Sequence, residues 1–141
     1  MAEAEDRYAR NKKVIEDFRA NGGKVPGRSS GFPLLLLTTT GAKSGQQRTT
    51  PVAYLPDGQG LVVFASKGGG PTSPDWYHNL VAHPSVTVEV GPETYQARAV
   101  VATGEEHDRL YARQAALYPV FGEYQSKTAR KIPVIILERV G

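Results

Sequence analysis

The sequence predicts one α+β domain built around a small barrel or closed sheet. Two β-rich pairs are each joined by a short turn typical of a hairpin, at residues 56–60 and 91–92. A further β-rich stretch ends the chain at residues 132–140. Helical segments stand only before and between these strands, whereas a doubly wound parallel fold would alternate strand and helix throughout. We therefore expect mainly antiparallel strands with peripheral helices.

Residues 4–21 predict an amphipathic helix, because Ala4, Tyr8, Ile15 and Phe18 fall near one face. The glycine pair at residues 22–23 is a typical helix stop. A loop rich in Gly, Pro and Ser follows. We expect residues 1–33 to form this helix and loop, and residues 34–141 to form the barrel, within a single domain overall.

The remaining elements follow from periodicity and from helix-start signals. Ser73 as N-cap and Pro74 at the first helical position predict a short helix that ends near His83. Thr103 and Glu106 form a capping-box pattern for a helix running to about residue 118. The expected strands are residues 34–40, 48–55, 61–66, 86–90, 95–101 and 132–140.

Composition excludes several classes of function. The 141 residues contain no cysteine, which excludes disulfides, thiolate metal sites and cysteine nucleophiles. The charged N-terminus has no apolar signal region, and the longest aliphatic run, residues 34–37, is far too short to span a bilayer. We expect a cytoplasmic protein.

The layout of charge indicates an anionic ligand. Between Phe18 and Pro74 there are six basic residues and one acid, Asp57. Such a segment focuses positive potential on an anionic partner. The basic residues are spread singly and no nucleic-acid motif accompanies them, so a small phosphorylated or carboxylated ligand fits better than nucleic acid.

The stretch GAKSGQQR, residues 41–48, is the first candidate site. Its glycines allow backbone N–H groups to converge, Ser44 adds a hydroxyl, and Lys43 and Arg48 supply charged donors to phosphate or carboxylate oxygens. It is not a P-loop, because the order is Lys-Ser-Gly and no helix follows. A solvated hairpin turn is the alternative.

Two further segments carry candidate residues. The glycine-rich stretch 66–79 could press its backbone against a flat ligand, or it could be a connection with Trp76 as a core residue. Tyr111, Tyr118, Phe121 and Tyr124 gather around the end of the last helix. The later aromatics follow Pro119 on what we interpret as a broken, mobile segment, which suits a lid over a planar substrate.

The histidines predict no metal site. His78 and His83 are five residues apart and His107 is remote, without a metal-ligand spacing. We expect ordinary surface or cap histidines, and no Ser-His-Asp arrangement follows from spacing.

Three stretches together resemble the deazaflavin-dependent nitroreductase family. They are LLLLTTTGAKSGQQRTTPVAYL, FASKGGG with the following PDWYHNLVAHPSVTVEV, and LYPVFGEYQSKTARKIPVIILER. This family is the branch of the split β-barrel flavin and deazaflavin oxidoreductases that uses coenzyme F420. The likeness covers residues 34–139, and the paired G-x-K-S-G-x-x-R and W-x-x-N signatures are fairly specific. The resemblance implies a split β-barrel of about six strands.

The resemblance also implies how the coenzyme binds. The basic turn would hold its phosphate and carboxylate tail, the next strand would flank the ring system, and the end of the third strand would present backbone groups to the pyrimidine edge. The start of the short helix would complete the tail site. The implied cofactor-binding residues are Ala42, Lys43, Ser44, Arg48, Thr49, Thr50, Pro51, Val52, Ala53, Ala65, Ser66, Lys67, Asp75, Trp76, Tyr77, His78 and Asn79.

By the same resemblance, the substrate pocket comprises Ala53, Ser66, Tyr118, Phe121 and Tyr124. Phe121 and Ala53 replace aromatics of the nitroimidazole-reducing member, so we expect reduction of quinones or enones rather than prodrug activation. The reaction would transfer a hydride from reduced deazaflavin to an electron-poor, hydrophobic acceptor. Tyr118 and Tyr124 are the candidate catalytic residues, as hydrogen-bond donors to the acceptor carbonyl.

Three alternatives remain at this level. One is an FMN enzyme on the same barrel, and a second is a carrier that binds F420 without catalysis. The third is a peripheral membrane protein that uses residues 1–21, although their five acids and five bases between Glu3 and Arg19 predict only weak attraction. A homodimer is compatible with each of them.

Overall fold

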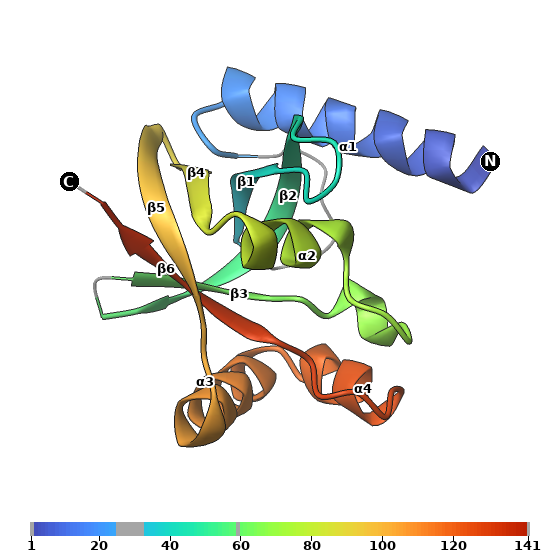
Figure 1. Cartoon of the computed structure of the whole chain (residues 1–141), viewed down its shortest axis with the longest axis vertical. Helices are drawn as coiled ribbons and strands as arrows, with labels where there is room; N and C mark the ends of the chain where they lie inside the picture. Colours follow the sequence, from blue (N-terminus) through green and yellow to red (C-terminus); the bar gives the residue numbers. More distant parts are fainter. Residues whose placement is uncertain (1, 25–32, 59, 141) are drawn as a thin grey trace.

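Six strands form a closed antiparallel barrel in the order β1-β2-β3-β6-β5-β4 (Figure 1). The computed structural model describes residues 2–24, 33–58 and 60–140, so most of the predicted loop before the barrel lies outside the described residues. Because β1 pairs with both β2 and β4, the sheet closes on itself. This confirms the predicted α+β barrel. The strands are β1 (Leu34–Thr40), β2 (Gln47–Asp57), β3 (Gly60–Phe64), β4 (Ser85–Val90), β5 (Glu93–Val101) and β6 (Val134–Arg139).

The apolar side chains form two cores, one on each side of the barrel wall. Alternate residues of the strands, such as Leu35 and Leu37 of β1, fill the barrel interior. Outward-facing residues of β3 and β6, such as Val62 and Val134, pack instead against the two helices that lie between β5 and β6 in the sequence. The third strand and the last strand therefore bury both of their faces, which is why they read as continuous apolar runs.

Helices surround the barrel (Figure 1). Helix α1 (Ala2–Ala20) lies across one end, where Phe18 is buried and Arg19 makes two hydrogen bonds to Glu89 of β4, at 2.9 and 2.8 Å. Helices α3 (Gly104–Leu117) and α4 (Val120–Ser126) pack on the outer faces of β3 and β6, and α2 (Asp75–Ala82) packs Trp76 and Leu80 against the interior core. Within the described residues, no helix is both long and apolar enough to cross a membrane.

Two helix-start predictions are wrong in detail. Pro74, not Ser73, is the N-cap of α2, because the Ser73 hydroxyl accepts a hydrogen bond from Arg130 at 3.1 Å. Thr103 is the N-cap of α3 but makes no side-chain capping bond. The following residue, Gly104, has φ +57°, so the chain enters this helix through a left-handed residue and the capping box does not form.

The segment interpreted as broken and mobile is a short helix, α4, and the glycine-rich stretch contains a 3-10 turn, η1 (Lys67–Gly69). Both were missed because each is shorter than the hydrophobic periodicity needed to detect a helix. They pack on one another, since a Cβ added to Gly69 would lie 2.8 Å from the carbonyl oxygen of Tyr124.

Asp57 ties the β2–β3 hairpin to α3 and makes stability depend on pH. Its carboxylate accepts two hydrogen bonds from Arg109, both at 3.2 Å, and one from Arg113 at 2.8 Å. The Arg109 hydrogen bonds lower the pKa of Asp57, with the Coulombic attraction of Arg109 and Arg113 adding to the effect.

Replacing Asp57 with asparagine should lower the free energy of unfolding at pH 7 by less than about 1 kcal/mol, because the ion pairs are largely exposed. Since the folded pKa is lowered, the contribution is present above the unfolded value of about 4 and is lost as pH falls through the folded pKa. Urea unfolding at pH 7 and pH 3 should show the gap between wild type and D57N closing in acid. An equal gap at both pH values would contradict the assignment.

Candidate active site

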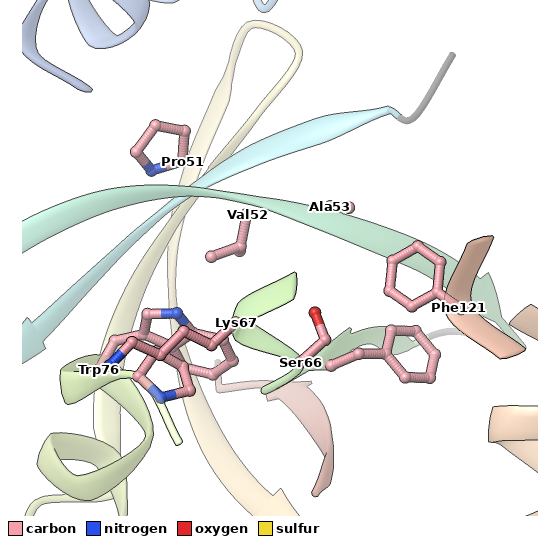
Figure 2. A pocket seen from close by; sticks show the side chains of 9 residues that line it. Pro51, Val52, Ala53, Ser66, Lys67, Trp76 and Phe121 are labelled. Atoms are coloured by element: carbon pink, nitrogen blue, oxygen red, sulfur yellow. The ribbon is translucent and has the colours of Figure 1, made fainter. Parts of the chain in front are cut away.

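A cavity of about 200 Å³ opens between β2, the end of β3, α2 and α4. Figure 2 shows Val52 pointing from β2 toward Ser66 and Lys67, with Trp76 on one side and Phe121 on the other. The wall is thus mainly apolar and aromatic, with one hydroxyl and one ammonium group, as expected of a small-molecule site. The lining residues are Pro51, Val52, Ala53, Phe64, Ser66, Lys67, Pro74, Trp76 and Phe121.

The segment after β3 reaches the cavity in an unusual backbone conformation. Lys67 has φ +47°, the one non-glycine residue with positive φ among those described. Such a residue is held only where the surrounding contacts determine it, and it often marks a functional site. Its ammonium group donates to the Thr72 hydroxyl at 3.3 Å, within the same loop. Ser66 and Lys67 therefore line the cavity from a loop whose backbone conformation is held by contacts with the residues around it.

Arg130 makes many of the hydrogen bonds that hold this loop in place. It was not among the residues predicted from the sequence. Its guanidinium donates to the carbonyl oxygens of Ala65, Ser66 and Gly70 and to the Ser73 hydroxyl, at distances between 2.9 and 3.2 Å. The only signal in the sequence was an arginine within the short stretch between the aromatic segment and the last strand. Nothing in that stretch indicated which carbonyls it would bind.

The basic turn after β1 is anchored to α2 by Asn79. The Asn79 side-chain oxygen accepts from the Ala42 N–H at 3.0 Å, and its amide nitrogen donates to the Thr39 hydroxyl at 3.2 Å. Within the turn, the Ser44 hydroxyl accepts from the Gln46 N–H at 3.2 Å and Gly45 has φ +71°. Asn79 thus uses its amide to position the turn, and its expected part in the tail site itself stays a prediction.

The turn presents a set of donors suited to an anion. Lys43 and Ser44 are exposed on the turn, and Arg48 is exposed at the start of β2, where it donates to the Gln46 side chain at 3.3 Å. Ammonium, guanidinium and hydroxyl groups are the donors that bind phosphate and carboxylate oxygens best. The residues present therefore fit an anionic tail beside the cavity.

The aromatic cluster at the other side of the cavity centres on Phe121. Its ring lies edge-on to Phe64 at 5.7 Å and to Tyr124 at 5.2 Å, between ring centroids. The Tyr111 hydroxyl donates to the Phe121 carbonyl at 2.6 Å, and burial raises the pKa of Tyr111 to about 12. Tyr118 and Tyr124 are half-buried against this cluster but do not line the cavity.

The structure gathers many of the predicted site residues and separates others. Seven predicted residues line the cavity: Pro51, Val52, Ala53, Ser66, Lys67, Trp76 and Phe121. Phe64 and Pro74 also line it and were not predicted. The other predicted binding residues lie on the basic turn, on β2, at the end of β3 or on α2, outside the cavity lining: Ala42, Lys43, Ser44, Arg48, Thr49, Thr50, Ala65, Asp75, Tyr77, His78 and Asn79.

Among the described residues, no group of three His, Asp or Glu side chains could hold a metal ion. His78 is exposed and His83 is the C-cap of α2, as expected. His107 corrects the prediction, because it is 6% exposed and its Nε2 lies 2.7 Å from the Ile132 carbonyl oxygen. That imidazole is a structural link between α3 and the start of the last strand.

Comparison with known proteins identifies relatives of this barrel. The model of the F420H2-dependent quinone reductase family matches residues 10–139. An F420H2-dependent quinone reductase of Mycobacterium tuberculosis is 44% identical over 131 residues, which cover 86% of this chain and 85% of the relative.

Two solved structures agree with this match. One, described as an F420-H2-dependent reductase, has a TM-score of 0.69 and 41% identity, and covers 75% of this chain and 94% of its own. Another, described as a domain-swapped dimer, has a TM-score of 0.72 and 34% identity, and covers 94% of this chain and 98% of its own. The chain therefore belongs to the F420H2-dependent quinone reductase family.

Proposed function

We propose that this chain reduces a quinone with coenzyme F420 bound across the cavity and the basic turn. Membership of the family makes the chain an oxidoreductase with F420 as its cofactor. The observation that supports the site is that one helix joins its two parts. Trp76 of α2 lines the cavity, and Asn79, one helical turn later, holds the basic turn. An apolar slot beside a cationic turn suits a ligand with a planar ring and an anionic tail.

In this assignment Lys43, Ser44 and Arg48 bind the tail, while Val52, Ser66 and Trp76 enclose the ring. When bound and reduced, the coenzyme supplies a hydride, which together with one proton converts a quinone into its hydroquinone. The chain contributes position and exclusion of water, since the walls of the cavity hold the two reactants close together. Phe121 provides an apolar surface for the acceptor.

The titration of oxidised F420 against FMN, followed by Trp76 fluorescence, tests the proposal. Trp76 is the single tryptophan and it lines the cavity, so its emission reports occupancy directly. We expect micromolar or tighter binding of F420, weak binding of FMN, and reduction of the soluble quinone menadione by reduced F420. Tight FMN binding would assign the chain to flavin chemistry, and F420 binding without turnover would indicate a carrier; either result would contradict the proposal.

Tyr118 and Tyr124 are proposed to donate hydrogen bonds to the acceptor carbonyl as negative charge develops on it. Replacing both with phenylalanine should reduce kcat about tenfold, the effect of one hydrogen bond of about 1.4 kcal/mol, and leave the Kd of F420 unchanged. Tyr95→Phe is the matched control, because Tyr95 of β5 lies beneath the Arg139 guanidinium and packs against the barrel core, apart from the cluster of Phe121. Unchanged turnover in the double variant would remove the catalytic role of these tyrosines.

Location and assembly are further parts of the proposal. A cytoplasmic location fits the sequence. Weak membrane contact through residues 1–21 gains no support from the described side chains of α1, because Phe18 packs against the barrel instead of facing outward. The dimeric relative favours a homodimer, which light scattering of the purified chain would detect.

A further inference from the structure

The Arg130 guanidinium binds three carbonyls of one loop at once. Its Nη2 lies 2.9 Å from the Ser66 carbonyl oxygen and 3.2 Å from the Ala65 carbonyl oxygen. Its Nε lies 3.0 Å from the Gly70 carbonyl oxygen. Its Nη1 donates to the same Ala65 oxygen and to Ser73. A planar fork of five N–H groups can satisfy this geometry, whereas an ammonium group cannot reach all of these acceptors.

These carbonyls fix the direction of the neighbouring N–H groups. The Ala65 oxygen shares its peptide with the Ser66 N–H, and the Ser66 oxygen shares its peptide with the Lys67 N–H. Both peptides are trans, so each N–H lies on the side opposite its carbonyl and therefore away from Arg130. Ser66 and Lys67 both line the cavity. No hydrogen bond found within the described part of the chain uses either of these two N–H groups.

Arg130 is itself held by the helix on the acceptor side of the cavity. The Gln125 side chain donates to the Arg130 carbonyl at 2.7 Å and accepts from the Ile132 N–H at 3.0 Å. Gln125 is one turn along α4 from Phe121, which lines the cavity. A continuous set of hydrogen bonds therefore connects α4 with the loop of Ser66 and Lys67.

We propose that Arg130 is a positioning residue that aims the Ser66 and Lys67 N–H groups into the cavity and fixes them relative to α4. The ligand they face is a carbonyl oxygen of the bound ring system, which two convergent N–H donors would hold in place. The guanidinium charge strengthens these donors by polarising both peptides. This inference rests on the proposed function for the identity of the ligand. The hydrogen bonds from Arg130 to the loop do not depend on that function.

Arg130→Lys and Arg130→Ala test the proposal, with Arg98→Gln as a control. Arg98 is an exposed cation on β5 that does not line the cavity, so R98Q removes a charge without touching the loop. The first readout needs no ligand. Gly69 and Gly70 donate to the Ser66 and Lys67 carbonyls, and their amide hydrogen exchange should accelerate at least about tenfold in both Arg130 variants.

The second readout is the titration with oxidised F420, followed by steady-state reduction of menadione. We expect kcat/KM to fall about 100-fold in R130A, as for a displacement of the order of 1 Å, and the Kd of F420 to rise at least about tenfold. Millimolar guanidinium chloride should restore part of the F420 affinity of R130A, whereas sodium chloride should not. Arg130→Lys keeps the charge and should recover little.

Distinct results separate this inference from the function on which it rests. Wild-type exchange rates, F420 affinity and kcat/KM in R130K would overturn the role of Arg130 while leaving the reductase assignment intact. Equal losses in R98Q would also overturn it, as a general effect of charge. If the wild-type chain bound no F420, the proposed function would be wrong. Accelerated exchange at Gly69 and Gly70 in the Arg130 variants would still show that Arg130 holds the loop.

Discussion

Replacing Gly69 with alanine is expected to lower the free energy of unfolding by about 2–4 kcal/mol and to displace α4 from the cavity. Gly69 has φ +80°, a conformation that alanine adopts only with strain. Its added Cβ would also meet backbone of Tyr124, 2.8 Å from the carbonyl oxygen and 3.0 Å from Cα. Backbone cannot move aside as a side chain can, so the turn η1 and α4 must separate.

Gly58→Ala separates strain from collision. Gly58 has φ +61° in the β2–β3 hairpin, and a Cβ there would find no atom within 4 Å. This variant should therefore lose only the strain, about 1–2 kcal/mol. Urea unfolding gives both values, and Trp76 titration with F420 should show weaker binding in G69A alone. Equal destabilisation by the two substitutions would mean that α4 can move away from residue 69 without a measurable loss of stability.

Replacing Asn79 with alanine is expected to weaken F420 binding about tenfold, because the basic turn loses its anchor and must be ordered by the ligand. The Thr39 hydroxyl, 1% exposed, also loses its donor. A buried group left without that partner should lower the free energy of unfolding by about 1–3 kcal/mol. The Kd from Trp76 fluorescence and the urea midpoint measure the two effects.

Asn79→Asp gives the sharper comparison. It keeps an oxygen that can accept from the Ala42 N–H, but it adds negative charge at the turn that carries Lys43. F420 should therefore bind to N79D more weakly than to N79A. Val81→Ala on the exposed face of the same helix should leave the Kd unchanged, since Val81 is 56% exposed. Tighter binding by N79D than by N79A would argue against an anion at this turn.

Sequence patterns predicted the barrel because its signals are local. Alternating and continuous apolar runs indicate the strands, and the hairpin turns at Gly58 and Gly91 indicate the pairing of β2 with β3 and of β4 with β5. The family resemblance, also confirmed, supplied the cofactor. The six strands appear at the predicted places with ends shifted by at most two residues.

The parts that could not be predicted depend on contacts distant in sequence. Ser73 has the sequence pattern of an N-cap, but its hydroxyl accepts a hydrogen bond from Arg130, 57 residues later. His107 was expected at the surface, but its ring is hydrogen-bonded to the Ile132 carbonyl oxygen. Asn79 was predicted as a binding residue, which stays a prediction, but its hydrogen bonds to the Ala42 N–H and the Thr39 hydroxyl were not predicted. In each case the residue type was recognised, but its partner is fixed only by the closed topology.

Closure of the barrel also limits how two copies could join. Every strand has a neighbour on both sides, so the described barrel has no edge strand that is free along its whole length. The ladders are nevertheless incomplete, because residues 47–53 of β2 pair only with β1, and the pairing of β2 with β3 spans residues 54–57. Another chain could therefore extend the intact barrel only at such a partial stretch and not along a whole strand. Copies can also meet through helix and side-chain surfaces, or they can exchange a whole element. Exchange of a strand requires the ladders on both of its sides to open first.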